Sequence, residues 1–272
     1  MSKQLQIKER IKEQYGKFAL SGDSDSCCSP TKNCCGTKDN NNGSSSVSGI
    51  DISKTVGYDP NKLDSIPRSS VLGLGCGNPT AFAHIKTGDI VVDLGSGAGI
   101  DVFLAANIVK DKGRVIGIDM TESMLDKARQ NAEEYGYNNV EFREGDIEAK
   151  IPVDDNYADI VISNCVINLT ENKLDSFKEI YRILKPRKEG KMIISDLATS
   201  KEIDRNSIDI SNWCSCIDGA LTKDNYLNAI RKAGIVDIEI LDEKLYSKVE
   251  DENNSNVKSR KVSSITIIAY KA

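Results

Sequence analysis

Apolar runs alternate with amphipathic stretches through the middle of the chain. Short apolar runs that end at glycine or at a polar residue predict strands over 89–97, 113–120, 140–146, 158–164 and 190–198. Apolar positions with helical spacing predict helices over 100–109, 121–136 and 171–186. Strands that alternate with helices predict an α/β fold, in which a mostly parallel, doubly wound sheet carries helices on both faces.

The N-terminal part of the chain has a different pattern. Residues 1–20 predict an amphipathic helix. Residues 21–49 are rich in serine, asparagine and glycine, and predict a flexible arm that carries two Cys-Cys pairs. We therefore separate this helix and arm (1–49) from a Rossmann-like domain over residues 50–199.

The last part of the chain, residues 200–272, is expected to close the fold. Residues 200–221 predict an irregular or helical segment, where such folds place substrate lids. A helix over 223–234 and two strands over 236–246 and 263–271 follow. The polar run between these two strands, 247–261, predicts a long exposed loop.

Charge and composition remove several classes of protein. The chain has 272 residues, 39% of them apolar, and a net charge of -5. An acidic chain offers no electrostatic footprint for nucleic acid or anionic membranes, and no apolar run approaches the roughly 18 residues of a membrane span. The first helix also lacks the apolar core and cleavage site of a signal peptide. We expect a cytoplasmic monomer with no nucleic-acid and no membrane partner.

A glycine-rich turn follows the first regular strand and indicates an adenosine cofactor. The segment VVDLGSGAGID places Gly95, Gly97 and Gly99 where a strand passes into a helix, so that the backbone can approach a ligand closely. Asp119 ends the next strand, at the position where ribose hydroxyls would be held. Gly-x-Gly alone is weak evidence, but this context and the acidic partner strengthen it.

A dinucleotide and S-adenosylmethionine compete for this site. Asp93 precedes the glycines and favours S-adenosylmethionine, because its charge suits the cationic end of that ligand and would repel a pyrophosphate. Asp146 is suited to accept a hydrogen bond from the adenine amino group, and Ile147 to contact the ring. The alternative for Asp146 is an ordinary turn residue.

Three of the eight cysteines fall where a substrate would bind. Cys165 ends the fourth strand, Cys76 lies in a glycine-rich loop, and Cys216 lies in the segment after the fifth strand. All three can converge on one pocket at the carboxyl ends of the strands. Thiolates select soft ions, and three thiolates with a single histidine in the chain suit trivalent arsenic better than zinc. For Cys165 alone, the alternative is a small buried apolar residue.

Five segments occur in a fixed order along the chain: LGLGCGNP, VVDLGSGAG, VIGIDMT, ISNCVINL and CIDGAL. In these segments, and over roughly residues 50–272, the chain resembles the arsenite methyltransferases, which are class I S-adenosylmethionine-dependent methyltransferases. The resemblance implies a seven-stranded sheet and methyl transfer from S-adenosylmethionine to arsenite and methylated arsenicals. It also implies a thiol reductant, glutathione or thioredoxin. One departure is LKPRKEGK after the third helix, where the family reads LKPGG.

The resemblance also implies roles for individual residues. Cys165 and Cys216 would bind As(III), and Cys76 would bind it too or pair with one of the arm thiols Cys27, Cys28, Cys34 and Cys35 during turnover. The segment 200–221 would then be an arsenic-binding lid, and Cys214 an extra thiol. We expect cofactor contacts from Gly75, Cys76, Gly77, Asp93, Gly95, Ser96, Gly97, Gly99, Asp119, Met120, Asp146, Ile147 and Asn164.

Two other functions remain open on the sequence. One is a small-molecule C- or O-methyltransferase of the quinone-pathway type, which the segment GIDMT also resembles. The other is a non-catalytic thiol protein that binds arsenic or soft metal ions. Serine at Cys165 and Cys216 would not affect the first, and the second would not need S-adenosylmethionine.

Overall fold

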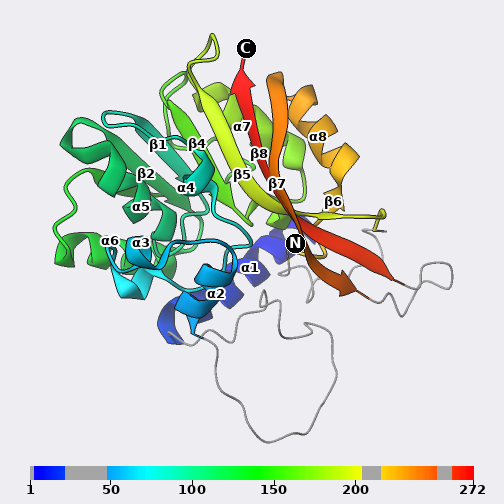
Figure 1. Ribbon diagram of the computed structural model, residues 1–272. Helices are drawn as coiled ribbons and strands as arrows, with labels where there is room; N and C mark the ends of the chain where they lie inside the picture. The colour runs from blue at the N-terminus through cyan, green and yellow to red at the C-terminus, as the bar shows by residue number, and fades with distance from the viewer. Residues whose placement is uncertain (1–2, 22–47, 204–215, 250–258) are drawn as a thin grey trace, which may run out of the picture.

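The computed structural model describes residues 3–21, 48–203, 216–249 and 259–272 (Figure 1). The predicted arm and its four thiols lie outside the described residues, as does Cys214. No helix in the described ranges combines the length and the apolar character that a membrane crossing requires.

One mixed sheet forms the centre of the molecule. Seven strands run in the order β3-β2-β1-β4-β5-β8-β7, and the two-residue strand β6 (Leu221–Thr222) pairs with β5. The parallel strands are β1 (Ile90–Leu94), β2 (Arg114–Asp119), β3 (Val140–Glu144), β4 (Ile160–Asn164) and β5 (Lys191–Thr199). The long strands β7 (Ile235–Val249) and β8 (Arg260–Lys271) close the sheet, with β8 antiparallel to both of its neighbours. The predicted seven-stranded, mostly parallel sheet is confirmed.

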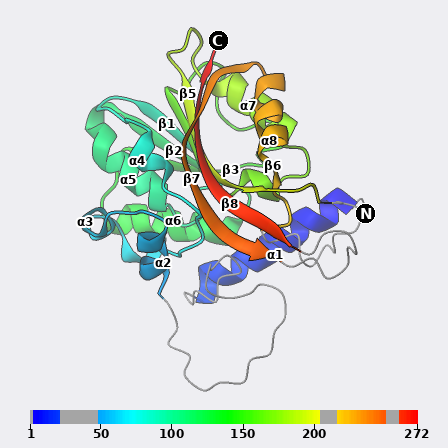
Figure 2. The same cartoon turned by 45° about the vertical axis from the view of Figure 1, so that its right-hand side comes forward.

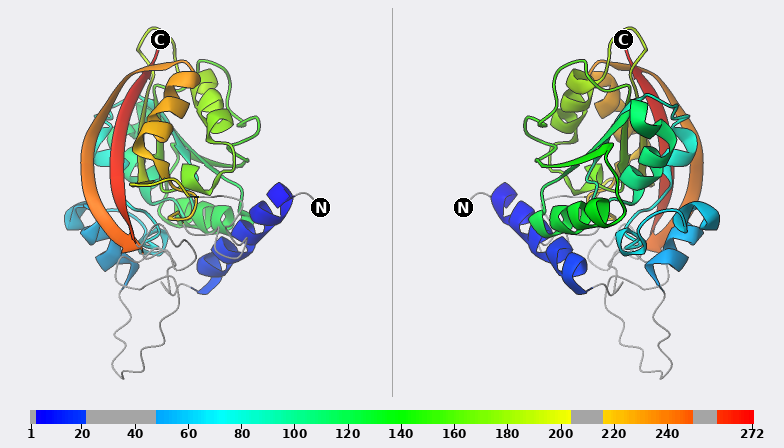
Figure 3. Two further views of the ribbon diagram at one scale, coloured as in Figure 1. Left: turned by 90° about the vertical axis from the view of Figure 1, so that its right-hand side faces the viewer. Right: turned by 90° about the vertical axis from the view of Figure 1, so that its left-hand side faces the viewer.

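Helices cover both faces of this sheet (Figure 3). The helices α5 (Ile100–Val109) and α6 (Glu122–Glu134) pack on one face, and α7 (Lys173–Ile183) and α8 (Lys223–Lys232) pack on the other. Successive strand residues alternate between the two cores: Val91 packs with α5, and Val92 packs with α7. Both side chains are fully buried, which explains why the strands appear as continuous apolar runs.

The N-terminal helix α1 (Lys3–Ser21) belongs to neither layer. It lies across one end of the sheet, as Figures 1 and 2 show, and contacts α6. The short helices α2 (Gly49–Thr55), α3 (Pro60–Leu63) and α4 (Pro79–Phe82) lead from there to β1. The predicted amphipathic helix is therefore present, and its apolar face packs against the end of the sheet.

The closing strands extend further than the sequence indicated. The run 247–261 was expected to be an exposed loop, but β7 continues to Val249, which pairs with Arg260 at the start of β8. Arg260 is 4% exposed, because its guanidinium bonds to the carbonyl of Ile217 and to Asp218. Strand pairing satisfies the backbone groups of the polar residues in this ribbon, and Val249 and Val262 pack on a buried apolar cluster. The prediction of a loop was wrong at both of its ends.

Candidate active site

A pocket lies at the carboxyl ends of β1, β2 and β4, where open α/β sheets bind their ligands. Its space is about 1150 Å³, including the part open to solvent. Ten of the residues that we expected to contact a cofactor line it: Gly75, Asp93, Gly95, Ser96, Gly97, Asp119, Met120, Asp146, Ile147 and Asn164. The sequence therefore located the pocket through residues that are far apart along the chain.

The glycine-rich turn after β1 forms the floor of this pocket. Gly95 has a φ of +72°, and a Cβ there would lie 2.3 Å from the side chain of Val166. The amide of Gly97 donates to Asp119 Oδ2 at 2.9 Å, while Asp119 Oδ1 accepts from the amide of Thr121 at 2.8 Å. Asp119 thus holds the turn in place and also lines the pocket, so its expected contact with ribose has to use its remaining lone pairs.

Three of the expected cofactor residues do not line the pocket. Gly99 begins α5, and a Cβ there would meet the ring of Phe103 at 2.6 Å. Gly77 packs on Ser195, and Cys76 points into an apolar cluster with the other thiols. These residues pack closely behind the pocket wall, and their expected contacts with a cofactor stay predictions.

Two carboxylates are buried at one end of the pocket. Asp93 is 3% exposed and Asp101 is 2% exposed, and neither has an ion-pair partner in the described part of the chain. Burial raises the pKa of Asp101 to about 6, even though Tyr58 and Asn164 donate hydrogen bonds to it. Burial and the neighbouring carboxylates Asp101 and Asp119 raise the pKa of Asp93 well above its usual range. A cationic ligand would relieve this repulsion.

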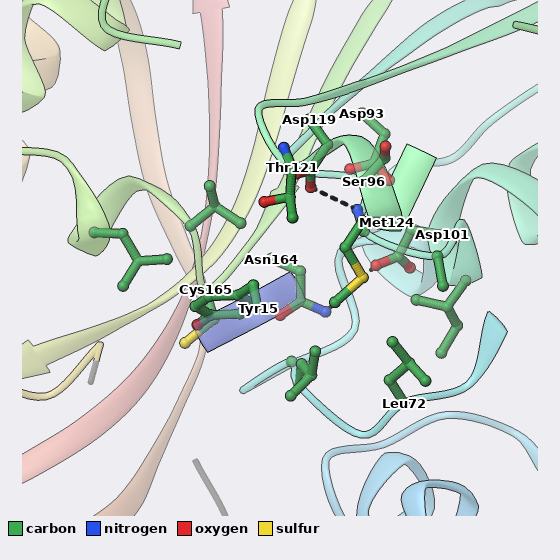
Figure 4. A pocket seen from close by; sticks show the side chains of 18 of the residues that line it. Tyr15, Leu72, Asp93, Ser96, Asp101, Asp119, Thr121, Met124, Asn164 and Cys165 are labelled. Atoms are coloured by element: carbon green, nitrogen blue, oxygen red, sulfur yellow. Dashed lines mark hydrogen bonds between the residues drawn. The ribbon is translucent and has the colours of Figure 1, made fainter. Parts of the chain in front are cut away.

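A buried hydroxyl also points to a ligand in this pocket. Ser96 Oγ is buried and has no hydrogen-bond partner among the described residues, although the residue lines the pocket. Figure 4 shows Ser96 beside Asp93 and Asp101. Buried polar atoms rarely remain unpaired, so Ser96 is suited to bond a polar group of a bound molecule.

Asn164, at the end of β4, connects the pocket to the loop that carries Cys76. Its Oδ1 accepts from the amides of Cys76 and Gly77 at 3.1 and 3.3 Å. Its Nδ2 donates to the carbonyl of Gly77 at 2.8 Å and to the hydroxyl of Tyr58 at 2.9 Å. A single side chain therefore fixes the Cys76 backbone beside the buried carboxylates.

The structure brings Cys76, Cys165 and Cys216 together next to the pocket. They are 3%, 3% and 1% exposed, and they share one cluster of apolar side chains. Cys216 Sγ donates to the backbone carbonyl of Cys165 at 2.8 Å. Cys165 also lines the cofactor pocket, and its φ of +60° places a non-glycine residue in the left-handed region. Strained backbone of this kind is often concentrated at functional sites.

Burial favours the protonated form of the Cys76 and Cys165 thiols. It raises the pKa of Cys76, and it raises the pKa of Cys165 well above the usual range, with hydrogen bonds to the two other cysteines adding to the effect. Both thiols are therefore uncharged at neutral pH.

Sequence reasoning missed Asp196, a carboxylate beside the thiols. One of its carboxylate oxygens lies within 4.8 Å of the sulfur atoms of Cys76 and Cys165, and these two sulfur atoms lie within the same distance of each other. Asp196 accepts hydrogen bonds from the amide of Asn168 and the hydroxyl of Tyr226, and burial raises its pKa to about 7. Its place near the end of β5, analogous to that of Cys165 on β4, is a signal that could have found it.

The sequence also gave no indication that α1 would line the pocket. Lys8, Ile11 and Tyr15 all do so, and Lys8 Nζ lies 2.6 Å from Asp146 and 3.1 Å from Glu148. Asp146 Oδ1 accepts from the amide of Glu148, so both of its oxygens have partners within the protein. Its expected contact with adenine would share these oxygens. The apolar face of the predicted helix indicated that the helix packs on the protein, but not where.

Comparisons with known proteins agree with this geometry. A family model described as a methyltransferase domain matches residues 85–234. The arsenite methyltransferase of Halobacterium salinarum is 39% identical over 243 residues, which are 86% of this chain and 59% of that protein. The arsenite methyltransferase of Mus musculus is 39% identical over 143 residues, which are 48% of this chain and 37% of that protein. The chain thus spans less than two thirds of the length of either relative.

A solved structure shows a similarity that covers most of both chains. The arsenic(III) S-adenosylmethionine methyltransferase of Chlamydomonas reinhardtii superposes with a TM-score of 0.61 and 30% sequence identity. The match covers 81% of this chain and 73% of that one. With its Rossmann-like sheet, its glycine-rich turn and these matches, the chain belongs to the class I methyltransferases, in the family that contains the arsenite methyltransferases.

Proposed function

We propose that the protein methylates thiol-bound arsenite, with S-adenosylmethionine as the methyl donor. The observation that carries this proposal is the position of Cys165, which lines the cofactor pocket and also belongs to a buried cluster with Cys76 and Cys216. A substrate held by these thiols would lie beside the reactive end of the cofactor. The relatives support the same substrate, because their names specify arsenite.

The pocket suits S-adenosylmethionine in charge and in shape. The cofactor supplies a methyl group on a cationic sulfonium and carries an ammonium group. Asp93 and Asp101 provide buried negative charge for these cations, and Ser96 offers an unpaired hydroxyl. The wall near Asp119 and the apolar side chains of Met120 and Ile147 would hold the adenosine. We assign these contacts as proposals on charge and position.

The substrate chemistry balances without a general base. Arsenite exchanges its hydroxyl groups for three thiols, and each thiol proton leaves with a hydroxyl as water. The arsenic keeps its lone pair, which attacks the sulfonium methyl in line, so no proton has to leave the nucleophile. The contribution of Cys76, Cys165 and Cys216 would be to hold arsenic in line with the methyl group.

A reductant is needed to complete the cycle. Methyl transfer uses the lone pair of arsenic and so oxidises it formally by two electrons. Two thiols can return these electrons by forming a disulfide, which glutathione or thioredoxin then reduces. We propose one of these reductants as a partner, and we place this chemistry in the reducing cytoplasm.

Product analysis with cysteine variants tests the proposal. The full chain is incubated with arsenite, S-adenosylmethionine and glutathione, and arsenic species are separated and identified by mass spectrometry. Cys165→Ser and Cys216→Ser should each lower the yield of methylated arsenic by about 100-fold, because arsenic is no longer held in line. Cys214→Ser is the matched control, and it should keep most of the activity.

The same experiment separates the two alternative functions. Methylation of an added organic acceptor, with release of S-adenosylhomocysteine and full activity in both serine variants, would identify a small-molecule methyltransferase. Tight arsenite binding with no methylated product would identify a non-catalytic thiol protein. In either case the proposal would be wrong, although the methyltransferase fold would stand.

A further inference from the structure

The N-terminal helix covers the cofactor pocket and the thiol cluster at the same time. Lys8, Ile11 and Tyr15 line the pocket, whereas Ile7 and Ile11 are buried in the cluster that contains Cys76, Cys165 and Cys216. Figure 4 shows Tyr15 next to Cys165, on the opposite side of the pocket from Asp93. The two sites therefore share α1 as a wall.

A polar contact fixes this helix at the adenosine end of the pocket. Lys8 Nζ bridges Asp146 and Glu148, and the side chains of Lys8 and Glu148 are only 20% and 5% exposed. Burial by itself would lower the pKa of Lys8, but the hydrogen bonds to Asp146 and Glu148 outweigh burial and raise it. A half-buried pair of this kind is screened less by solvent than a surface pair.

Apolar contacts fix the same helix over the thiols. Ile7 is 2% exposed and Ile11 is 3% exposed, and the cluster around them includes Leu169 and Val262. Near the C-terminal end of α1, the carbonyl of Ala19 accepts a hydrogen bond from Lys127 at 2.8 Å, and Ala19 packs with Ala98 and Met124. The contacts of Lys8 and Ile11 are the ones that lie on surfaces a bound cofactor would touch.

We propose that α1 is a binding element shared by the two sites, and that bound cofactor secures α1 over the thiols. Lys8, Ile11 and Tyr15 contact the adenosyl ligand. Ile7, on the same helix, packs on the thiol cluster, so a ligand that holds α1 in place also holds Ile7 over the thiols. Because the coupling is a free energy, it is reciprocal: loosening α1 at the thiols weakens the binding of the cofactor. This inference rests on the proposed use of S-adenosylmethionine, but it does not require arsenic to be the substrate.

The first test measures the binding of S-adenosylhomocysteine by calorimetry. Ile7 touches the thiol cluster but does not line the cofactor pocket, so Ile7→Ala should weaken binding only by loosening α1. We expect the dissociation constant to rise about tenfold. Val262→Ala is the matched control, because Val262 lies in the same cluster but on β8. Its dissociation constant should stay within about twofold of the wild-type value.

The second test measures how far α1 shields the thiols, as the rate at which Cys216 is alkylated. Cys216 does not line the pocket, so slower alkylation of Cys216 in the presence of ligand reports closure by α1 and not shielding by the ligand. Saturating S-adenosylhomocysteine should slow this alkylation in the wild-type protein, and Ile7→Ala should remove most of the slowing.

Either of two results would overturn the inference. One is an unchanged dissociation constant for Ile7→Ala, and the other is a Cys216 alkylation rate that does not respond to ligand. Neither readout involves arsenic methylation. The proposal of arsenic methylation could therefore fail while this inference holds, and this inference could fail while arsenic methylation holds.

Discussion

At the scale of single residues, the site is defined by charge that is buried without a counter-charge. Asp93 and Asp101 are both nearly inaccessible, and burial, together with repulsion from Asp101 and Asp119, raises the pKa of Asp93. The sequence identified Asp93 from its place before the glycines. It did not identify Asp101 or Asp196, because a carboxylate inside a helix or a strand is usually a surface residue until the fold shows what surrounds it.

The raised pKa of Asp101 predicts how cofactor binding depends on pH. Its value of about 6 means that the carboxylate loses its charge as the pH falls through 6, and with it the attraction for a cationic ligand. We expect S-adenosylmethionine to bind more weakly at pH 5.5 than at pH 7.5, as measured by calorimetry.

The variant Asp101→Asn checks that this residue causes the effect. It should bind the cofactor more weakly at pH 7.5, and its affinity should change less between the two pH values. A wild-type affinity that is the same at both pH values would refute the role of Asp101.

At the scale of elements, the sequence predicted what periodicity can show. The parallel strands, the layer helices and even the helical state of 1–20 were predicted, because each has a clear apolar pattern. Contacts between elements that are distant along the chain were not predicted. No pattern in the local sequence indicates that α1 packs on the pocket or that β7 and β8 pair through Val249 and Arg260. Both depend on contacts that form only in the folded chain.

The segment that carries Cys216 should depend on Gly219. A Cβ at Gly219 would lie 1.8 Å from the backbone carbonyl of Asn168, so Gly219→Ala has to displace the segment and, with it, Cys216. We expect arsenite to bind about tenfold more weakly. Binding of S-adenosylhomocysteine should not change, because Gly219 does not line the cofactor pocket.

The control for this substitution is Gly136→Ala. Gly136 also lies in a turn, with a φ of +71°, but a Cβ there would meet nothing within 4 Å. It should lower stability slightly and leave arsenite binding intact. Equal arsenite affinity in Gly219→Ala and Gly136→Ala would show that the segment does not set the position of Cys216.

At the scale of the whole molecule, two sites meet at one edge of a single sheet. The cofactor pocket lies at the ends of β1, β2 and β4, and the thiol cluster takes residues from the ends of β4 and β5 and from α1. Figure 2 shows α1 lying across this end of the sheet. Cys165 belongs to both sites. The arrangement explains how one small chain could hold a soft substrate next to a methyl donor while keeping both away from water.

A single-turnover measurement tests this account most directly. Protein loaded with one equivalent of arsenite is mixed with S-adenosylmethionine that carries a deuterated methyl group, and the bound arsenic is released and analysed by mass spectrometry. We predict labelled monomethylarsenic in wild-type protein and almost none in Cys165→Ser. Unlabelled arsenite in the wild type, with the cofactor bound, would contradict the claim that this protein methylates arsenic on its buried thiols.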